Sequence, residues 1–117
     1  MVEQVYELNA VFRSLGDPTR RDILKRVSRR SMSIGDIAGH YELTFAAVAK
    51  HLTVLEHAGL VSKTRRGKEQ IVAIAPEALA AASDCLETYQ QLWEQRLGRL
   101  NTYLQASNTK KKEYETN

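Results

Sequence analysis

The chain of 117 residues is long enough for one compact domain, and its composition, 43% hydrophobic and 26% charged, is that of a globular protein. No apolar run is long enough to cross a membrane and the acidic start is unlike a signal peptide, so we expect a cytoplasmic protein without a membrane partner. A single cysteine, Cys85, excludes an intramolecular disulfide and a thiolate metal cage. The net charge is only +3, but residues 13–68 hold 12 Lys and Arg against 5 Asp and Glu. This basic segment predicts a surface that binds a polyanion; a solvated basic face is the alternative.

The first two helices are predicted by apolar residues at helical spacing. The first runs through residues 5–15 and ends at Gly16, a residue typical of helix C-termini. Asp17 and Pro18 then begin a second helix, because a carboxylate accepts the free amide protons of a first turn and proline suits the first helical position. The apolar positions are Val5, Leu8, Val11, Phe12 and Leu15 in the first helix, and Ile23, Leu24 and Val27 in the second.

Two further helices and a tight turn follow. Ser33, with Asp36 three residues later, resembles a capping box that begins a short third helix. Thr44 is the N-cap candidate of a fourth helix that Gly59 closes. Only residues 42–43 would then separate the two helices, which predicts a helix-turn-helix with a steep crossing. Its buried positions are Ile34, Ile37 and Ala38, followed by Val48, Leu52 and Leu55.

A β-hairpin is predicted directly after the helix-turn-helix. Residues 60–65 and 69–75 read as two strands of mixed pattern, and Gly67 between them can take the positive φ that a hairpin turn needs. The fold class is therefore mainly α with a small β-hairpin wing at 61–74, a winged helix-turn-helix.

Pro76 begins the last helix, whose apolar residues recur at steps of three or four over seven turns. A small domain cannot cover so long a stripe, so this helix needs a partner. The apolar periodicity is lost from Gln105 onward. We therefore expect a DNA-binding and dimerisation domain over 1–105 and a disordered tail over 106–117.

The outward face of the fourth helix carries small and cationic side chains. A helix that enters the major groove of DNA favours small side chains in its first turn and cations farther along. The alanines allow close approach, the threonine can cap the helix and touch phosphate, the lysine and histidine can reach phosphate or guanine, and Phe45 suits a thymine methyl. The alternative is an ordinary surface helix with Phe45 folded into the core. The DNA-facing residues predicted on this helix are Thr44, Phe45, Ala46, Ala47, Lys50 and His51.

Two other groups of cations flank this helix. Arg65, Arg66 and Lys68 surround the glycine of the hairpin tip, a spacing suited to a phosphate backbone or a minor groove. Arg20 and Arg21 open the second helix, where positive charge gains nothing from the helix dipole. For these two arginines, phosphate contact and an intramolecular pair with Asp17, Asp22 or Asp36 both remain open.

Together these stretches resemble a known family. LGDPTRRDILKRV, followed by SIGDIAGHYELTFAAVAKHLTVLEHAGLVSKTRRGKEQ, is similar to the ArsR/SmtB winged-helix bacterial repressors from residue 12 to about 104. The resemblance implies a homodimer paired through its first and last helices, with the AVAKHL helix in the major groove of each half-site. The predicted dimer interface comprises Leu8, Leu86, Tyr89, Trp93, Leu97 and Leu100.

The sequence departs from the metal-sensing members of that family. Residues 33–36 replace the Cys-x-Cys of the thiol sensors, and residues 76–105 lack the histidines of the zinc sensors. We therefore expect no metal site and no cofactor. The last helix resembles a non-metal branch with a long Trp-bearing helix. Trp93 and Tyr89 are interpreted as core and dimer residues, and a pocket for a small-molecule inducer is the alternative. The acidic neighbours of Cys85 argue against a redox switch.

The sequence thus predicts a DNA-binding transcriptional regulator, a homodimeric repressor that binds an inverted-repeat operator through the helix at 44–58 and the wing at 61–74. No phosphate-cradling glycine loop or activated nucleophile is present, so we expect no enzyme activity. The alternative function is a winged-helix protein-interaction module without operator binding.

Overall fold

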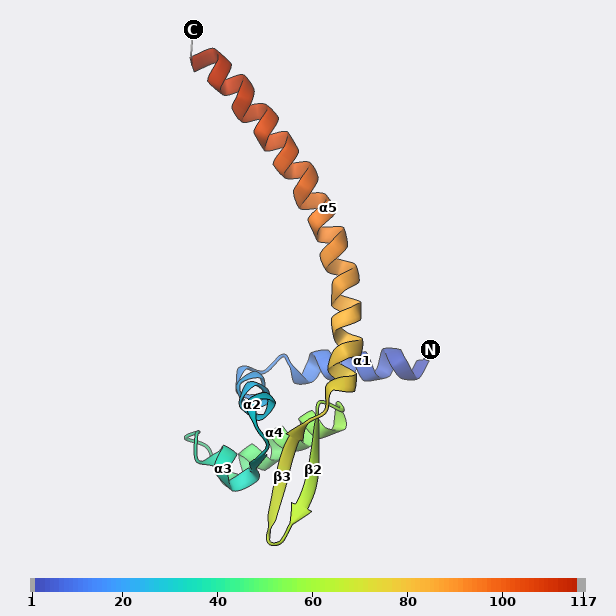
Figure 1. Cartoon of the computed structure of the whole chain (residues 1–117), viewed down its shortest axis with the longest axis vertical. Helices are drawn as coiled ribbons and strands as arrows, with labels where there is room; N and C mark the ends of the chain where they lie inside the picture. Colours follow the sequence, from blue (N-terminus) through green and yellow to red (C-terminus); the bar gives the residue numbers. More distant parts are fainter. Residues whose placement is uncertain (1, 116–117) are drawn as a thin grey trace. The chain divides into compact units, whose positions relative to one another are not determined.

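The computed structural model describes residues 2–115, and the side chains of residues 8–107. The chain divides after Ser83 into two compact units. The elements, in chain order, are α1 (Val2–Ser14), α2 (Pro18–Arg29), β1 (Met32–Ser33), α3 (Ile34–Ala38), α4 (Phe45–His57), β2 (Val61–Arg66), β3 (Glu69–Ile74) and α5 (Pro76–Glu115). Figure 1 labels all of these elements except β1.

Three predicted N-caps begin the helices α2, α3 and α4 of the first unit. The Asp17 carboxylate accepts the amide of Arg20 at 3.0 Å, and the Ser33 hydroxyl accepts that of Asp36 at 3.0 Å. Thr44 caps α4 in the same way. Each bond satisfies an amide that the first turn of a helix leaves without a partner, so these caps confirm where α2, α3 and α4 begin.

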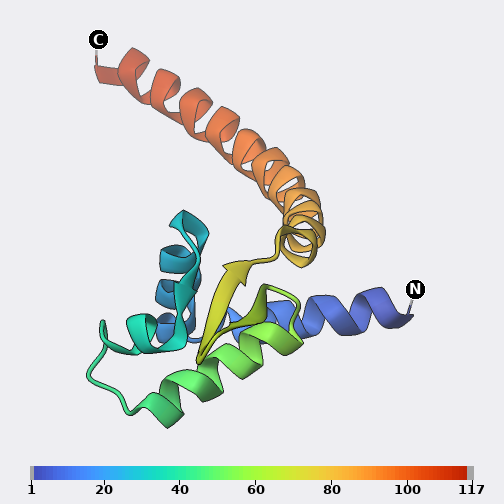
Figure 2. The same cartoon turned by 60° about the horizontal axis from the view of Figure 1, so that its bottom comes forward.

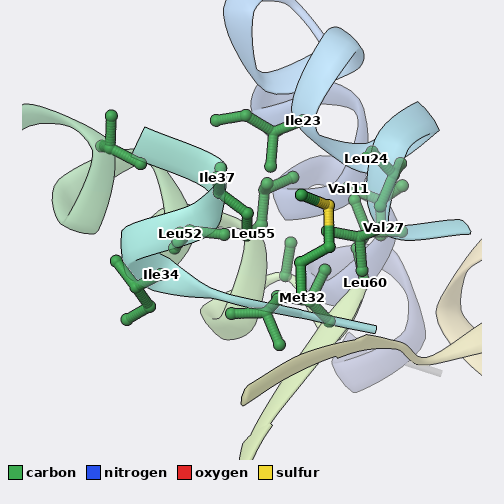
Figure 3. Packing of buried hydrophobic residues seen from close by; sticks show 14 of the residues in the cluster. Val11, Ile23, Leu24, Val27, Met32, Ile34, Ile37, Leu52, Leu55 and Leu60 are labelled. Carbon is green, nitrogen blue, oxygen red and sulfur yellow. The ribbon is translucent and has the colours of Figure 1, made fainter. Parts of the chain in front are cut away.

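The core of the first unit lies where its helices face the sheet. Figure 3 shows side chains of α2, β1, α3 and α4 converging there, with Ile23, Ile37, Leu52 and Leu55 wholly buried. Burying one such side chain stabilises the fold by about 1.5–3 kcal/mol. The full set of buried apolar residues is Val11, Ile23, Leu24, Val27, Met32, Ile34, Ile37, Val48, Leu52, Leu55, Ala58, Leu60, Val61, Val72 and Ala82.

The hairpin of β2 and β3 forms as predicted, and Gly67 in its turn has φ +65°. A third strand, β1, joins it, so that the antiparallel sheet has the order β1-β3-β2, with Met32 paired to Val72. The sequence did not predict β1, because a strand of two residues is too short to show a periodicity of its own. The sheet thereby ties the start of α3 to the wing.

The turn of the helix-turn-helix is longer than the sequence predicted. α3 ends at Ala38 and α4 begins at Phe45, so the connection exceeds the expected residues 42–43. After Ala38 the backbone tightens, with His40 donating to Ile37 at 3.1 Å and Tyr41 to Ala38 at 3.2 Å. Such bonds to the third residue back are the usual way a short helix ends. Figure 2 shows α3 and α4 joined by this turn, with the hairpin running along α4.

α5 is a 40-residue helix that extends to Glu115. The backbone is therefore helical over 106–115, where the sequence predicted a disordered tail, and residues 116–117 lie outside the described part. The physical reason is that adding a residue to an existing helix needs no new nucleus, and the Lys and Glu of this segment are good helix formers. The loss of apolar periodicity marks the end of the stripe and not of the helix.

Candidate nucleic-acid interface

The outward face of α4 follows from how its inner face is buried. Val48, Leu52 and Leu55 are completely buried at helical spacing, which turns the other side of the helix to solvent. On that side Lys50 is exposed. Phe45 precedes the buried stripe at the first turn of the helix, and 59% of it is exposed. The alternative that placed Phe45 in the core is therefore wrong. A large aromatic residue in water at the start of a helix is available to a ligand.

The remaining predicted residues of α4 divide into two groups. Thr44 and Ala46 are exposed beside Phe45, and the Thr44 hydroxyl accepts the amide of Ala47 at 3.1 Å. His51 is half-buried at the edge of this face, with its Nδ1 atom 3.4 Å from Nη1 of Arg20. The imidazole thus adjoins α2 as well as the outward face.

Arg20 and Arg21 have a role that neither sequence interpretation anticipated. The Arg20 guanidinium donates to the carbonyl of Ser14 at 2.7 Å, and Arg21 donates to the carbonyl of Leu15 at 2.8 Å. A longer bond of 3.4 Å joins Arg20 to the carbonyl of Arg13. The last carbonyls of a helix lack partners and carry partial negative charge, so two cations at the start of α2 stabilise the end of α1.

A polar cluster ties the turn before α4 to α2. The Tyr41 hydroxyl donates to the Asp22 carboxylate at 2.5 Å, and Arg26 donates to the same carboxylate at 3.0 Å and to the Tyr41 oxygen at 3.2 Å. The bonds from Tyr41 and Arg26 lower the pKa of Asp22. Burial, followed by the bond to Asp22, raises the pKa of Tyr41 to about 12. The cluster therefore holds the turn that leads into α4.

The hairpin tip carries three exposed cations. Arg65 and Arg66 end β2, and Lys68 follows Gly67. The Arg65 guanidinium makes one long bond, 3.4 Å, to the carbonyl of Gly67. These exposed cations stay hydrated in the free protein and are not held by any carboxylate among the described side chains, so they are available to contact phosphate.

A hollow of about 630 Å³ lies between α4, the start of α3 and the hairpin. α4 contributes Phe45, Ala49 and Thr53 to its lining, and the hairpin contributes Lys63 and Arg65. The further lining residues are Ser33, Ile34, Gly35, Lys68, Glu69 and Gln70. Of the residues predicted to face DNA, the hollow is therefore lined by Phe45 of α4 and by Arg65 and Lys68 of the hairpin. Sequence reasoning missed Thr53 and Lys63, whose only signal was their positions within a helix and a strand.

Comparison with known proteins identifies this architecture. Residues 17–63 match the family described as bacterial regulatory proteins of the arsR family. The transcriptional repressor SdpR of Bacillus subtilis is 38% identical over 61 residues, which cover 52% of this chain and 68% of SdpR. The chain belongs to the ArsR family. It is therefore a transcriptional regulator with a DNA-binding winged helix-turn-helix, and not an enzyme.

Solved structures agree with ArsR membership. An ArsR-like transcriptional regulator from Rhodococcus sp. RHA1 superposes with a TM-score of 0.67 and 31% identity, over 82% of this chain and 91% of its own. The homodimeric winged helix-turn-helix DNA-binding domain Mb0332 of Mycobacterium bovis has the same fold, with a TM-score of 0.59 and 22% identity over 77% of this chain and 81% of its own. The predicted winged helix-turn-helix is thereby confirmed.

For this ArsR-family chain, the described side chains contain no group of three or more His, Cys, Asp or Glu residues placed to hold a metal ion. Within residues 2–115, no helix is both long and apolar enough to span a membrane. Cys85 is a free, half-buried thiol.

The stripe on α5 is exposed in the single chain. Its members Leu86, Tyr89, Trp93, Leu97 and Leu100 are between 43% and 65% exposed. On the first unit, Leu8 of α1 is half-buried against the core. An open hollow of about 500 Å³ lies along α5, lined by Tyr89, Leu92, Trp93, Gln95, Arg96 and Arg99. An inducer site at these aromatic residues stays a prediction.

Proposed function

We propose that this regulator is a homodimeric repressor that binds an inverted-repeat operator, with α4 in the major groove and the hairpin tip on the adjacent backbone or minor groove. The observation that carries the proposal is the exposed face of α4. Lys50 lies on the side of α4 opposite the three buried residues, and Phe45 is 59% exposed in the first turn, so both can reach base edges without disturbing the core. The cations Arg65, Arg66 and Lys68 then supply the phosphate contacts that orient a protein on DNA.

Dimerisation is supported by the apolar stripe on α5. Leu86 and Leu97 are eleven residues apart, a spacing that returns a side chain to the same side of an α-helix. Aromatic and leucine side chains that are half exposed in one chain are stabilised when a second copy covers them. The Mycobacterium bovis domain with this fold is homodimeric. A two-fold axis relates two copies of α4, which is why the proposed operator is an inverted repeat.

Repression follows from occupancy. A dimer bound over a promoter excludes polymerase, and the similar Bacillus subtilis protein is named a transcriptional repressor. Release would require a signal that lowers the operator affinity. The absence of a metal-ligand cluster among the described side chains favours a signal other than a metal ion.

The test has two stages. Selection of bound fragments from genomic DNA with the purified protein should recover an inverted repeat. Titration of that fragment should then show Lys50→Ala weakening specific binding by about 1–3 kcal/mol, because a base contact is lost. Arg66→Ala should weaken binding to all duplexes and reduce the salt slope by about one, because a phosphate contact is lost.

Lys25→Ala is the matched control, since it removes an exposed cation from α2 and not from the proposed interface. It should leave the affinity nearly unchanged. If both Lys50→Ala and Arg66→Ala bind as tightly as the wild type, the proposed DNA face is wrong. If the wild type shows no salt-dependent binding to duplex DNA at all, a protein-interaction module replaces the proposal.

A further inference from the structure

Lys63 differs from the other cations of the hairpin. Its side chain is 14% exposed, whereas Arg65, Arg66 and Lys68 near the tip are all exposed. The Lys63 ammonium reaches from β2 to α4, where Nζ lies 3.3 Å from Oγ1 of Thr53 and 3.5 Å from Oε1 of Glu56. This cation is therefore bound within the protein, while its neighbours are free to meet a ligand.

Both partners of Lys63 belong to one side of α4. Thr53 and Glu56 are three residues apart, so they are neighbours on the helix surface. The Thr53 hydroxyl donates to the carbonyl of Ala49 at 3.0 Å, which leaves its oxygen free to accept from Lys63. A single ammonium thus holds two points of α4.

The other end of the Lys63 side chain is equally well fixed. Lys63 pairs with Val72 across the β2–β3 ladder, and Val72 is completely buried. The strand therefore has a defined register at this point, because a slip by one residue would move Val72 out of the core. The contact joins this strand to the helix that carries the exposed residues Phe45 and Lys50.

We propose that Lys63 is a positioning residue that sets the spacing between the outward face of α4 and the hairpin tip, without itself contacting DNA. The inference rests on the proposed function. Two elements that must meet two features of one duplex bind more tightly when their spacing is held in advance, since less conformational freedom is lost on binding. The hollow between them is lined by Thr53 and Lys63 together, which places the contact between the two proposed DNA-binding elements.

Lys63→Met, Glu56→Gln and the double variant test this role. Methionine keeps most of the stem and removes the charge, and glutamine keeps the shape of glutamate. The measured quantity is the ratio of affinities for the selected operator fragment and for an unrelated duplex of equal length. Each single variant should lower this ratio by about two- to fivefold, the range for a partly exposed ion pair. The double variant should lose no more than the worse single variant, because both remove the same contact.

The salt dependence separates positioning from direct contact. Lys63→Met should leave the salt slope unchanged, because no phosphate contact is lost. A slope that falls by about one, with Glu56→Gln behaving as wild type, would show that Lys63 contacts the backbone and overturn the proposal. Unchanged affinity ratios in both single variants, or additive losses in the double variant, would overturn it as well.

Failure of this inference is distinguishable from failure of the proposed function. If the wild type has no operator, amide hydrogen exchange still reports on the contact in the free protein. Lys63→Met and Glu56→Gln should then speed the exchange of α4 amides to similar extents, relative to Lys25→Met. Wild-type exchange rates in both variants would show that Lys63 does not hold α4.

Discussion

Leu97→Glu should dissociate the proposed dimer while leaving the protomer folded. Leu97 is 43% exposed in the single chain, so a charge there is readily hydrated before pairing. Complete burial of a leucine contributes about 1.5–3 kcal/mol, and covering the exposed part therefore contributes about 1 kcal/mol per protomer. A buried, unpaired carboxylate costs several kcal/mol more. With two copies in each dimer, the total exceeds about 5 kcal/mol, or more than three powers of ten in Kd.

Light scattering measures the outcome directly. The wild type should have twice the chain mass of 13.2 kDa, and Leu97→Glu should have that mass once. Operator binding should be lost with the dimer, although no DNA-facing residue has changed. Gln91→Glu is the control, because Gln91 neighbours Glu87 and Glu94 on the polar side of α5 and should stay dimeric. A wild-type monomer that binds its operator tightly, or a dimeric Leu97→Glu, would refute the reasoning.

Three further outcomes are expected. Stoichiometric zinc, cadmium or arsenite should leave operator affinity unchanged, and calorimetry that finds tight metal binding together with weakened DNA binding would contradict this. Tyr41→Phe should cost about 1 kcal/mol in urea unfolding at neutral pH. Because the pKa of Asp22 is lowered in the folded protein, the ionised carboxylate stabilises the fold fully above its unfolded pKa of about 4, and this contribution is lost as the pH falls through the lower folded value. Tyr41→Phe removes the largest cause of that lowered pKa, so the stability of the variant should fall less steeply in acid than that of the wild type. Gly59→Ala should lower the free energy of unfolding by about 1–2 kcal/mol, since φ of residue 59 is +77° and the added Cβ would lie 3.3 Å from Cβ of Ala78. The control is Gly98→Ala, whose added Cβ meets no atom within 4 Å and which should not lower the melting temperature.

The sequence was sufficient wherever a structural feature depends on residues close together in the chain. Asp17, Ser33 and Thr44 each cap a helix through an amide three residues away, and Gly59 and Gly67 take the positive φ that ends a helix or turns a hairpin. The side chain and its target are separated by a few bonds, so the local pattern predicts the contact. Helical spacing likewise identified the buried side of α4, and with it the outward face proposed to bind DNA.

Only the tertiary structure decided which cations make contacts within the protein and which stay exposed. Arg20 stabilises the end of α1, Arg66 is exposed at the hairpin, and Lys63 joins β2 to α4. The two-residue strand β1 and the bonds of Tyr41 to α2 are also tertiary features. Arg20, Lys63, β1 and Tyr41 each contact a different helix or strand. The position of that partner depends on how the core packs, even where the two residues are only six or ten positions apart in the chain, as for Arg20 and Lys63. The sequence by itself determined the helices, the hairpin and the basic segment, because those follow from local geometry and charge. Packing decided which cations remain free for a ligand, because it brings the carbonyls and carboxylates of other elements within reach of Arg20 and Lys63 and leaves Arg66 exposed.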